Sequence, residues 1–234
     1  IQMFKNKKIL AIIPARSGSK KIKNKNIIEI KKKPLIYYSI VEAIKSKYID
    51  EICLSTDSVK IQSISKSFGL NSFFLRPKIL STDSALTKDV VLHALNKSEN
   101  FFEKSFDYIV LLQPTCPLRK AHHVDEAIIK IINNNQNSLI SVCDVEGYHP
   151  NRMKIIQKNL LYNYTQDKAE DMTPRQKLPK VYIRNGAIYI SKVNFLKKNK
   201  ALTDTKSVPY IMKQTDSINI DGPIDLELAK ALLK

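Results

Sequence analysis

Short apolar runs alternate along the chain with longer segments whose apolar residues recur every three or four positions. The runs have the length expected of strands and comprise residues 9–13, 51–55, 108–112 and 139–143. Apolar positions at helical spacing follow three of them, in residues 35–43, 61–68 and 124–132. Alternating strands and helices predict a Rossmann-like α/β fold, a mostly parallel sheet with helices on both faces. Ligands of such sheets bind outside the carboxyl ends of the strands.

Residues 148–180 interrupt this alternation, because they are polar, contain three prolines and show no apolar period. Loops of this length are unusual in a compact domain and are often functional or reach another subunit. We therefore expect one domain over residues 1–234, with an excursion from the sheet at about 148–180.

Weaker patterns follow this excursion. Residues 181–190 resemble a strand around Asn185-Gly186, a dipeptide that makes a tight turn or permits close approach of the backbone to a ligand. Ile218 and Ile220 predict one more strand, and residues 224–233 predict a closing helix behind Asp221.

Composition limits the expected cellular location of the protein and the kinds of molecule that it binds. No apolar run approaches the roughly 20 residues needed to span a bilayer, so we expect a cytoplasmic protein without a membrane partner. The formal charge of +17 attracts anions, either nucleic acid or small phosphorylated and carboxylated molecules. Because the chain lacks nucleic-acid recognition motifs, a small anionic substrate is favoured, and a basic nucleic-acid-binding α/β protein is the alternative.

A basic, hydroxyl-rich loop leaves the first apolar run at the edge where α/β sheets bind ligands. Its sequence is Pro14-Ala15-Arg16-Ser17-Gly18-Ser19-Lys20. Gly18 permits a turn whose backbone amides face an anion, while Arg16 and Lys20 supply charge to phosphate oxygens. The loop matches neither the GxxxxGK[ST] nor the GxGxxG pattern, so an ordinary turn is the alternative.

This loop, continued by Lys25-Asn26, resembles the N-terminal signature of the acylneuraminate cytidylyltransferases, also called CMP-sialic acid synthetases. Further blocks resemble the family in the same order, and together they span nearly the whole chain. They are Ser55-Thr56-Asp57, Leu75-Arg76-Pro77, Gln113-Pro114-Thr115-Cys116-Pro117-Leu118-Arg119, Arg175-Gln176-Lys177-Leu178-Pro179 and Asn185-Gly186-Ala187-Ile188-Tyr189. The resemblance implies a nucleotide-binding α/β sheet with a small dimerisation element, to which residues 148–180 contribute, and a homodimer.

The resemblance also implies a reaction. CTP reacts with a nine-carbon acidic sugar, whose anomeric hydroxyl attacks the α-phosphorus and expels pyrophosphate with help from Mg²⁺ or Mn²⁺. Arg16 and Lys20 are expected to stabilise phosphate charge, with Asp221 as the third catalytic residue. From the sequence alone, a surface ion pair for Arg76 and a helix N-cap for Thr87 are alternatives. The expected nucleotide contacts are Ala15, Arg16, Ser17, Gly18, Ser19, Lys25, Asn26, Arg76 and Thr87.

A second group of residues is expected around the sugar. Gln113 ends the third apolar run, where its amide can both donate to and accept from a sugar, although a strand-ending turn residue is the alternative. An arginine suits bidentate recognition of the substrate carboxylate. Tyr189 is expected in the pocket wall or the core. The full set of expected sugar contacts is Gln113, Arg152, Arg175, Asn185 and Tyr189.

The expected metal site departs from the family pattern. The family often has Asp-Ile-Asp near the C terminus, whereas this chain has Asn219-Ile220-Asp221. Residues two apart on a strand face the same side, so Asp221 is expected to bind the metal with Asn219 as a neutral helper. Asp216 and Asp225 are alternative ligands, and a helix N-cap is the alternative role for Asp221.

The sequence favours one group of sugars. The block Asn185-Gly186-Ala187-Ile188-Tyr189 resembles the sialate branch of the family more than the pseudaminate branch. N-acetylneuraminic acid or a close analogue such as legionaminic acid is therefore the expected substrate. Pseudaminic acid and the eight-carbon sugar Kdo are the alternatives.

Overall fold

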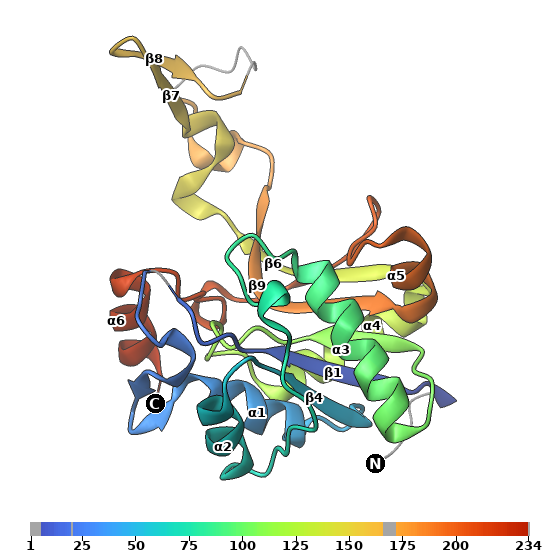
Figure 1. The fold of residues 1–234 in the computed structure, drawn as a ribbon. Coiled ribbons are helices and arrows are strands. Elements are labelled where there is room, and N and C mark those ends of the chain that lie inside the picture. The colour runs from blue at the N-terminus through green and yellow to red at the C-terminus, as the bar shows by residue number, and fades with distance from the viewer. Residues whose placement is uncertain (1–5, 20, 166–171, 234) are drawn as a thin grey trace.

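A six-stranded sheet forms the centre of the computed structural model, which describes residues 6–19, 21–165 and 172–233 (Figure 1). The strand order is β10-β6-β9-β5-β1-β4. Every neighbouring pair is parallel except the pairs that involve β9. The predicted mostly parallel sheet is confirmed. The strand bounds are β1 Ile9–Pro14, β4 Glu51–Ser55, β5 Tyr108–Leu111, β6 Ser138–Asp144, β9 Tyr182–Lys192 and β10 Val208–Ile211.

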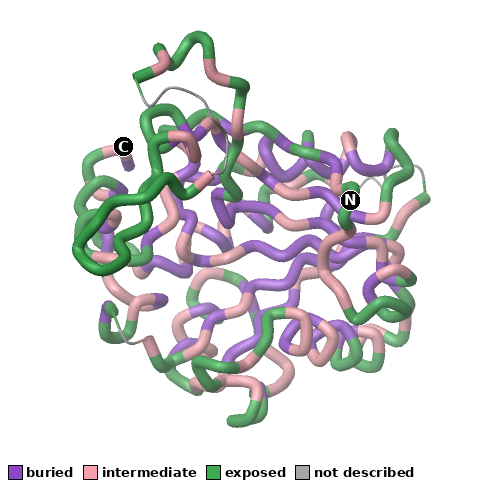
Figure 2. The backbone as a smooth tube through the Cα atoms, turned by 90° about the horizontal axis from the view of Figure 1, so that it is seen from above, coloured by how far each residue is buried: buried purple, intermediate pink, exposed green. Residues whose placement is uncertain are grey.

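Helices cover both faces of this sheet. Alternate residues of β1 divide the core: Ile9 packs with α1, α2 and α4, while Leu10 packs with α3 and α5. Figure 2 shows buried backbone concentrated in the strands and exposed backbone around them. The predicted helices on both faces are therefore confirmed. The helix bounds are α1 Leu35–Lys45, α2 Val59–Lys66, α3 Thr87–Phe102, α4 Ala121–Asn134, α5 Val193–Asn199 and α6 Pro223–Leu232.

Two expectations about the C-terminal half were wrong. Ile218 and Ile220 do not belong to a strand, because the edge of the sheet beside β6 is taken by β10. Residues 217–220 instead form no helix or strand, and the amide of Ile220 donates to the carbonyl oxygen of Thr115 at 2.8 Å. Asn185-Gly186 is not a turn either, since it lies inside β9, where the register with β6 shifts.

Residues 148–165 and 172–180 leave the sheet as an arm that projects away from the body of the molecule (Figure 1). The arm carries an antiparallel hairpin of β7, Lys154–Gln157, and β8, Leu160–Asn163. A second hairpin, of β2, Glu29–Ile30, and β3, Lys33–Pro34, precedes α1. Among the described residues, no helix has the length and apolar character needed to cross a membrane.

Candidate active site

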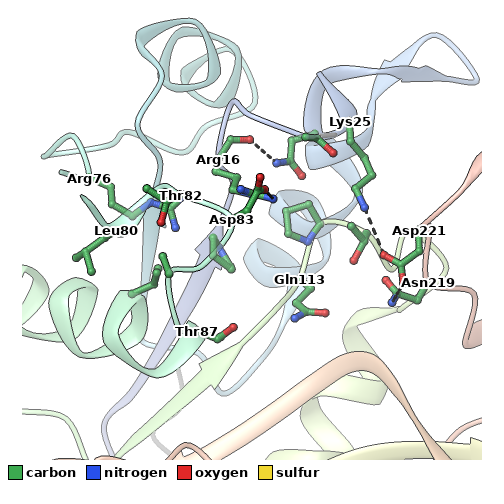
Figure 3. A pocket seen from close by; sticks show the side chains of 17 residues that line it. Arg16, Lys25, Arg76, Leu80, Thr82, Asp83, Thr87, Gln113, Asn219 and Asp221 are labelled. Carbon is green, nitrogen blue, oxygen red and sulfur yellow. Dashed lines mark hydrogen bonds and ion pairs between the residues drawn. The ribbon is translucent and has the colours of Figure 1, made fainter. Parts of the chain in front are cut away.

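A cleft of about 420 Å³ opens at the carboxyl ends of β1 and β5 (Figure 3). The chain passes from β1 to β4 on one side and then returns to β5 on the other, and such a reversal is where open α/β sheets bind ligands. The cleft brings together nine of the residues expected from the sequence. They are Arg16, Ser19, Lys25, Asn26, Arg76, Thr87, Gln113, Asn219 and Asp221.

The basic loop after β1 is held in place by its neighbours. The Asp57 carboxylate accepts from the Ser17 amide and hydroxyl, both at 2.8 Å, and the Asn26 amide donates to the Arg16 carbonyl oxygen at 2.9 Å. The buried Ala15 donates its amide to Ser55 at the end of β4. Space around Gly18 is open, so packing does not require a glycine at this position. Lys20 lies outside the described residues.

Asp57 was not assigned a role from the sequence. Its signal was the Ser55-Thr56-Asp57 block directly after a predicted strand, which places a carboxylate at the same edge of the sheet as the basic loop. Thr82 and Asp83 were also missed. Both line the cleft, and the Asp83 carboxylate forms an ion pair with Arg16 at 2.5 Å.

Arg76 and Thr87 lie together on the wall beside α3. The surface ion pair considered for Arg76 is wrong, because this residue is only 5% exposed. Burial lowers the pKa of its guanidinium; nearby Asp57 opposes that shift and Arg16 adds to it. Within the described part of the chain, its Nε and Nη2 atoms have no hydrogen-bond partner. Thr87 is not the N-cap of α3, since Leu86 occupies that position. Arg76 therefore offers unused donors beside the cleft.

Gln113 follows β5, and its backbone and side chain are both constrained. Its carbonyl oxygen accepts from Arg119 Nη1 at 3.2 Å and from the Ser39 hydroxyl at 3.3 Å. Arg119 also donates to the carbonyl oxygen of Ala187 in β9 at 2.7 Å, and burial lowers the pKa of this arginine to about 10. Gly186 has φ +76°, and a Cβ there would lie 2.9 Å from Gln113 Oε1. The glycine is needed both for its backbone angle and for this close approach.

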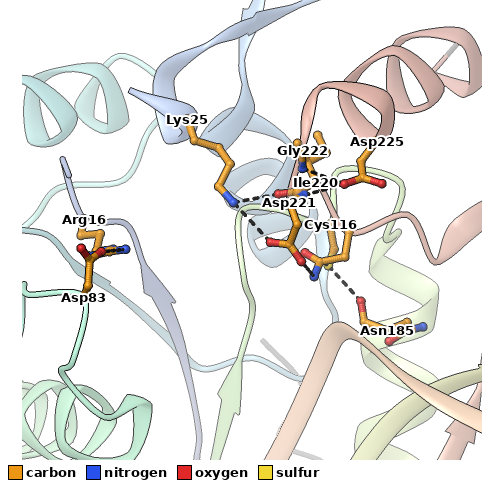
Figure 4. Close-up of polar contacts among 10 residues, drawn as sticks. Arg16, Lys25, Asp83, Cys116, Asn185, Ile220, Asp221, Gly222 and Asp225 are labelled. Carbon is orange, nitrogen blue, oxygen red and sulfur yellow. Dashed lines mark hydrogen bonds and ion pairs between the residues drawn. The ribbon is translucent and has the colours of Figure 1, made fainter. Parts of the chain in front are cut away.

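Asp221 lies at the opposite end of the cleft from Arg76 (Figure 3). Its side chain is 63% exposed and contacts Lys25 Nζ at 3.4 Å. The N-cap alternative for Asp221 is wrong, because Gly222 is the N-cap of α6 and the Asp225 carboxylate accepts from the amides of Asp221 and Gly222 (Figure 4). Asn219 donates its amide to Asp221 Oδ2 at 3.1 Å, so the two residues meet as expected.

Comparison with known proteins gives the family. The family model described as Cytidylyltransferase matches residues 10–233. A Legionella pneumophila CMP-N,N'-diacetyllegionaminic acid synthase is 33% identical over 97% of this chain and 97% of its own length. An Escherichia coli N-acylneuraminate cytidylyltransferase is 34% identical over 95% of this chain, which spans 51% of that relative. A Campylobacter jejuni pseudaminic acid cytidylyltransferase is 32% identical over 97% of this chain and 97% of its own length.

The chain belongs to the cytidylyltransferase family. It is a nucleotidyltransferase, as the resemblance implied. The fold agrees, because the solved structure of CMP:2-keto-3-deoxy-manno-octonic acid synthetase complexed with CTP has a TM-score of 0.71 at 16% identity, covering 96% of this chain and 98% of that one.

Four residues expected at the sugar lie outside the main cleft of this cytidylyltransferase. Asn185 is buried, where its side chain accepts from Ser141 at 2.6 Å and donates to Ser217 at 2.9 Å. Tyr189 packs against the core on the α3 side of the sheet. Arg152 and Arg175 line two separate hollows along the arm. Arg175 also lies 3.6 Å from the Asp144 carboxylate at the base of the arm.

Few side chains near the cleft are suited to bind the metal expected from the sequence. The described residues contain no group of three His, Cys, Asp or Glu side chains that could hold a metal ion. Of the alternative ligands, Asp225 caps α6 and Asp216 lies 3.7 Å from His123. Asp221 remains the exposed carboxylate at this end of the cleft.

Proposed function

We propose that this cytidylyltransferase activates a nonulosonic acid with CTP, giving the CMP-sugar and pyrophosphate. The observation that carries the proposal is the cleft, which gathers phosphate-binding cations, an unused buried guanidinium and an exposed carboxylate at the reversal point of the sheet. Each group can then be given a part in the reaction.

The triphosphate is proposed to lie between Arg16 and Lys25. These cations come from the loop after β1 and the turn that follows it, and both line the cleft. Their charge stabilises the negative charge that develops on the phosphate oxygens as pyrophosphate leaves. The contacts of the Ser17 amide and of the Asn26 side chain hold the loop, so Arg16 is placed before the substrate arrives.

The base is proposed to lie against Arg76 and Thr87. Cytosine presents a carbonyl oxygen and a ring nitrogen that accept hydrogen bonds, and the Arg76 guanidinium at this wall has donors at Nε and Nη2 that are unpaired among the described residues. These donors are buried and would meet the base after a shift of the side chain. Without such an acceptor, buried guanidinium groups stay unsatisfied at a cost. This match supports a pyrimidine base with an accepting edge at this wall.

The sugar is proposed to contact Gln113, which lines the cleft; its backbone carbonyl oxygen accepts from Arg119, and its side-chain oxygen lies close to Gly186. The named relatives act on N-acetylneuraminic-type, legionaminic and pseudaminic acids at 32–34% identity, so identity alone does not separate these sugars. The block from Asn185 to Tyr189 favours N-acetylneuraminic or legionaminic acid over pseudaminic acid.

A divalent cation, Mg²⁺ or Mn²⁺, fits the donor set of the cleft. Mg²⁺ usually binds through one or two carboxylates together with substrate phosphates, and Asp221 supplies one exposed carboxylate beside the proposed triphosphate position. When bound, the ion neutralises charge on the phosphate oxygens.

The protein is proposed to act as a cytoplasmic homodimer in which the arm meets a second copy of the chain. Apolar side chains on the arm are widely exposed, among them Ile156 at 73%, Leu161 at 68% and Met172 at 84%. Soluble proteins rarely leave apolar groups clustered in this way, and a partner surface would cover them. Such a dimer would also let Arg152 and Arg175 approach the partner's cleft.

A pyrophosphate-release screen tests the function. Purified protein is incubated with CTP, Mg²⁺ and a panel containing N-acetylneuraminic acid, N,N'-diacetyllegionaminic acid, pseudaminic acid and Kdo. UTP replaces CTP in a parallel series. We expect release only with CTP and a nonulosonic acid. Release with every triphosphate, or with none of the acids, would refute the proposal.

A further inference from the structure

Both carboxylate oxygens of Asp221 are contacted by donors of the chain itself. Lys25 Nζ lies 3.4 Å from Oδ1, and the Asn219 amide nitrogen donates to Oδ2 at 3.1 Å (Figure 4). A cation that binds this carboxylate must therefore compete with an ammonium and an amide that already face it.

The orientation of the Asn219 amide follows from these contacts. If the amide were turned over, its oxygen would lie about where its nitrogen lies, facing an ionised carboxylate oxygen, and two acceptors would oppose each other. In the observed orientation the amide oxygen points to the Cys116 thiol at 3.7 Å, although that thiol also contacts the carbonyl oxygen of Asn185 at 3.4 Å. The amide oxygen thus faces away from Asp221.

Lys25 is held at this position by more than the ion pair. Its ammonium donates to the carbonyl oxygen of Ile220 at 2.8 Å, and its side chain is only 15% exposed. The exposed Asp221 carboxylate alone would bind it weakly, because solvent screens such pairs. The backbone contact therefore keeps a positive charge beside Asp221, and this charge repels a divalent cation.

We propose that Lys25 takes the cation's place on Asp221 until the triphosphate draws its ammonium away, and that Asn219 is a positioning residue rather than a metal ligand. The inference rests on the proposed function, in which Lys25 binds the triphosphate. The Asp221 carboxylate would therefore be open to a divalent cation only when the nucleotide is bound, with Asn219 holding that carboxylate in its orientation. An aspartate at 219 would instead place two carboxylates together and attract the metal by itself.

The test measures Mn²⁺ binding by electron paramagnetic resonance, on purified protein without nucleotide or sugar. Lys25→Met is compared with wild type and with Lys230→Met, a matched control that removes a lysine from an exposed pair with Glu227. We expect weak Mn²⁺ binding by wild type and by the control, and binding at least about tenfold tighter by Lys25→Met. Adding Asp221→Asn to Lys25→Met should abolish that gain.

Two further variants separate positioning from ligation and guard against a folding defect in Lys25→Met. Asn219→Asp should also tighten Mn²⁺ binding about tenfold or more, since it adds a charged oxygen ligand. In the Lys25→Met protein, Asn219→Ala should weaken Mn²⁺ binding by less than about threefold, because the Asp221 carboxylate loses an orienting donor but the ion loses no ligand.

Tight Mn²⁺ binding by wild type that Asp221→Asn removes would overturn the inference, as would unchanged binding in both Lys25→Met and Asn219→Asp. A tenfold loss on Asn219→Ala would make Asn219 a ligand. Because no substrate is present, these results do not depend on catalysis, and a failure of the proposed function appears separately in the pyrophosphate screen.

Discussion

In the cleft, charged side chains are held by backbone atoms and by one another, whereas the arm leaves large apolar side chains open to solvent. Arg16 pairs with Asp83, and Lys25 donates to the carbonyl oxygen of Ile220. By contrast, Ile156 and Met172 on the arm are 73% and 84% exposed. The cleft is thus organised within one chain, while the arm exposes apolar side chains that the proposed dimer would cover. Substitutions in the two regions should therefore fail in different ways.

The largest effect is expected in the cleft, from Asp221→Asn. Loss of the carboxylate that orients a charge-neutralising ion should lower kcat on the order of 10²-fold or more, without unfolding the protein. The matched control is Asp225→Asn, which removes charge four residues away at the cap of α6. It should lower stability by about 1 kcal/mol with nearly normal turnover. Rate against free Mg²⁺ and thermal melting distinguish them. A normal rate for Asp221→Asn would reassign the metal role.

Arg16→Ala should have the next largest effect. Removal of a charge-assisted phosphate contact worth about 1.5–3 kcal/mol should lower kcat/KM for CTP on the order of 10- to 100-fold. The protein should stay folded, because the ion pair with Asp83 is partly exposed and contributes little. Lys20→Ala is expected to behave similarly from the sequence. Wild-type turnover by folded Arg16→Ala would remove this loop from the active site.

A substitution on the arm should change the assembly of the proposed dimer. Leu161→Asp puts a charge on its exposed apolar surface and should raise the dimer dissociation constant about tenfold or more, since burial of a leucine contributes roughly 1.5–3 kcal/mol. Ile224→Asp, at an 83% exposed residue of α6, is the matched control and should leave assembly unchanged. Light scattering at working concentrations measures both. A fully active wild-type monomer would refute the dimer itself.

The smallest effect is expected from Gly186→Ala, beside Gln113. The left-handed backbone angle costs an alanine about 1–2 kcal/mol, and the new methyl group must displace Gln113 Oε1. We expect a several-fold rise in KM for the sugar, a smaller change in KM for CTP and a lower melting temperature. Equal changes in both KM values would argue against a sugar contact by Gln113.

The sequence predicted the elements whose apolar pattern is local and strong, as in β1, β4, β5 and α4. It missed α5, which is short, and β10, an edge strand that contains Pro209 and buries only alternate residues. No helix range was predicted for α3 either, although Val90, Val91, Ala94 and Leu95 recur at a helical spacing that could have been recognised.

The site was partly readable for a different reason. The loop from Pro14 to Lys20 follows one strongly patterned strand, and Gln113 follows another. Their place at one edge of the sheet could therefore be predicted. The pairing of Arg16 with Asp83, and of Lys25 with Asp221, could not, because these residues meet only through the tertiary fold. The side-chain amide of Asn185 bonds to Ser141 on β6 and to Ser217. No local sequence pattern indicates these contacts.

The central claim is that the cleft joins CMP to an acidic nine-carbon sugar. Phosphorus NMR of a mixture of the protein, CTP, Mg²⁺ and N-acetylneuraminic or N,N'-diacetyllegionaminic acid tests it most directly. We expect the CTP resonances to be replaced by one phosphodiester resonance and by pyrophosphate in equal amounts, and only when an acid sugar is present. Pyrophosphate without a phosphodiester, or unchanged CTP with folded protein and every nonulosonic acid, would contradict it.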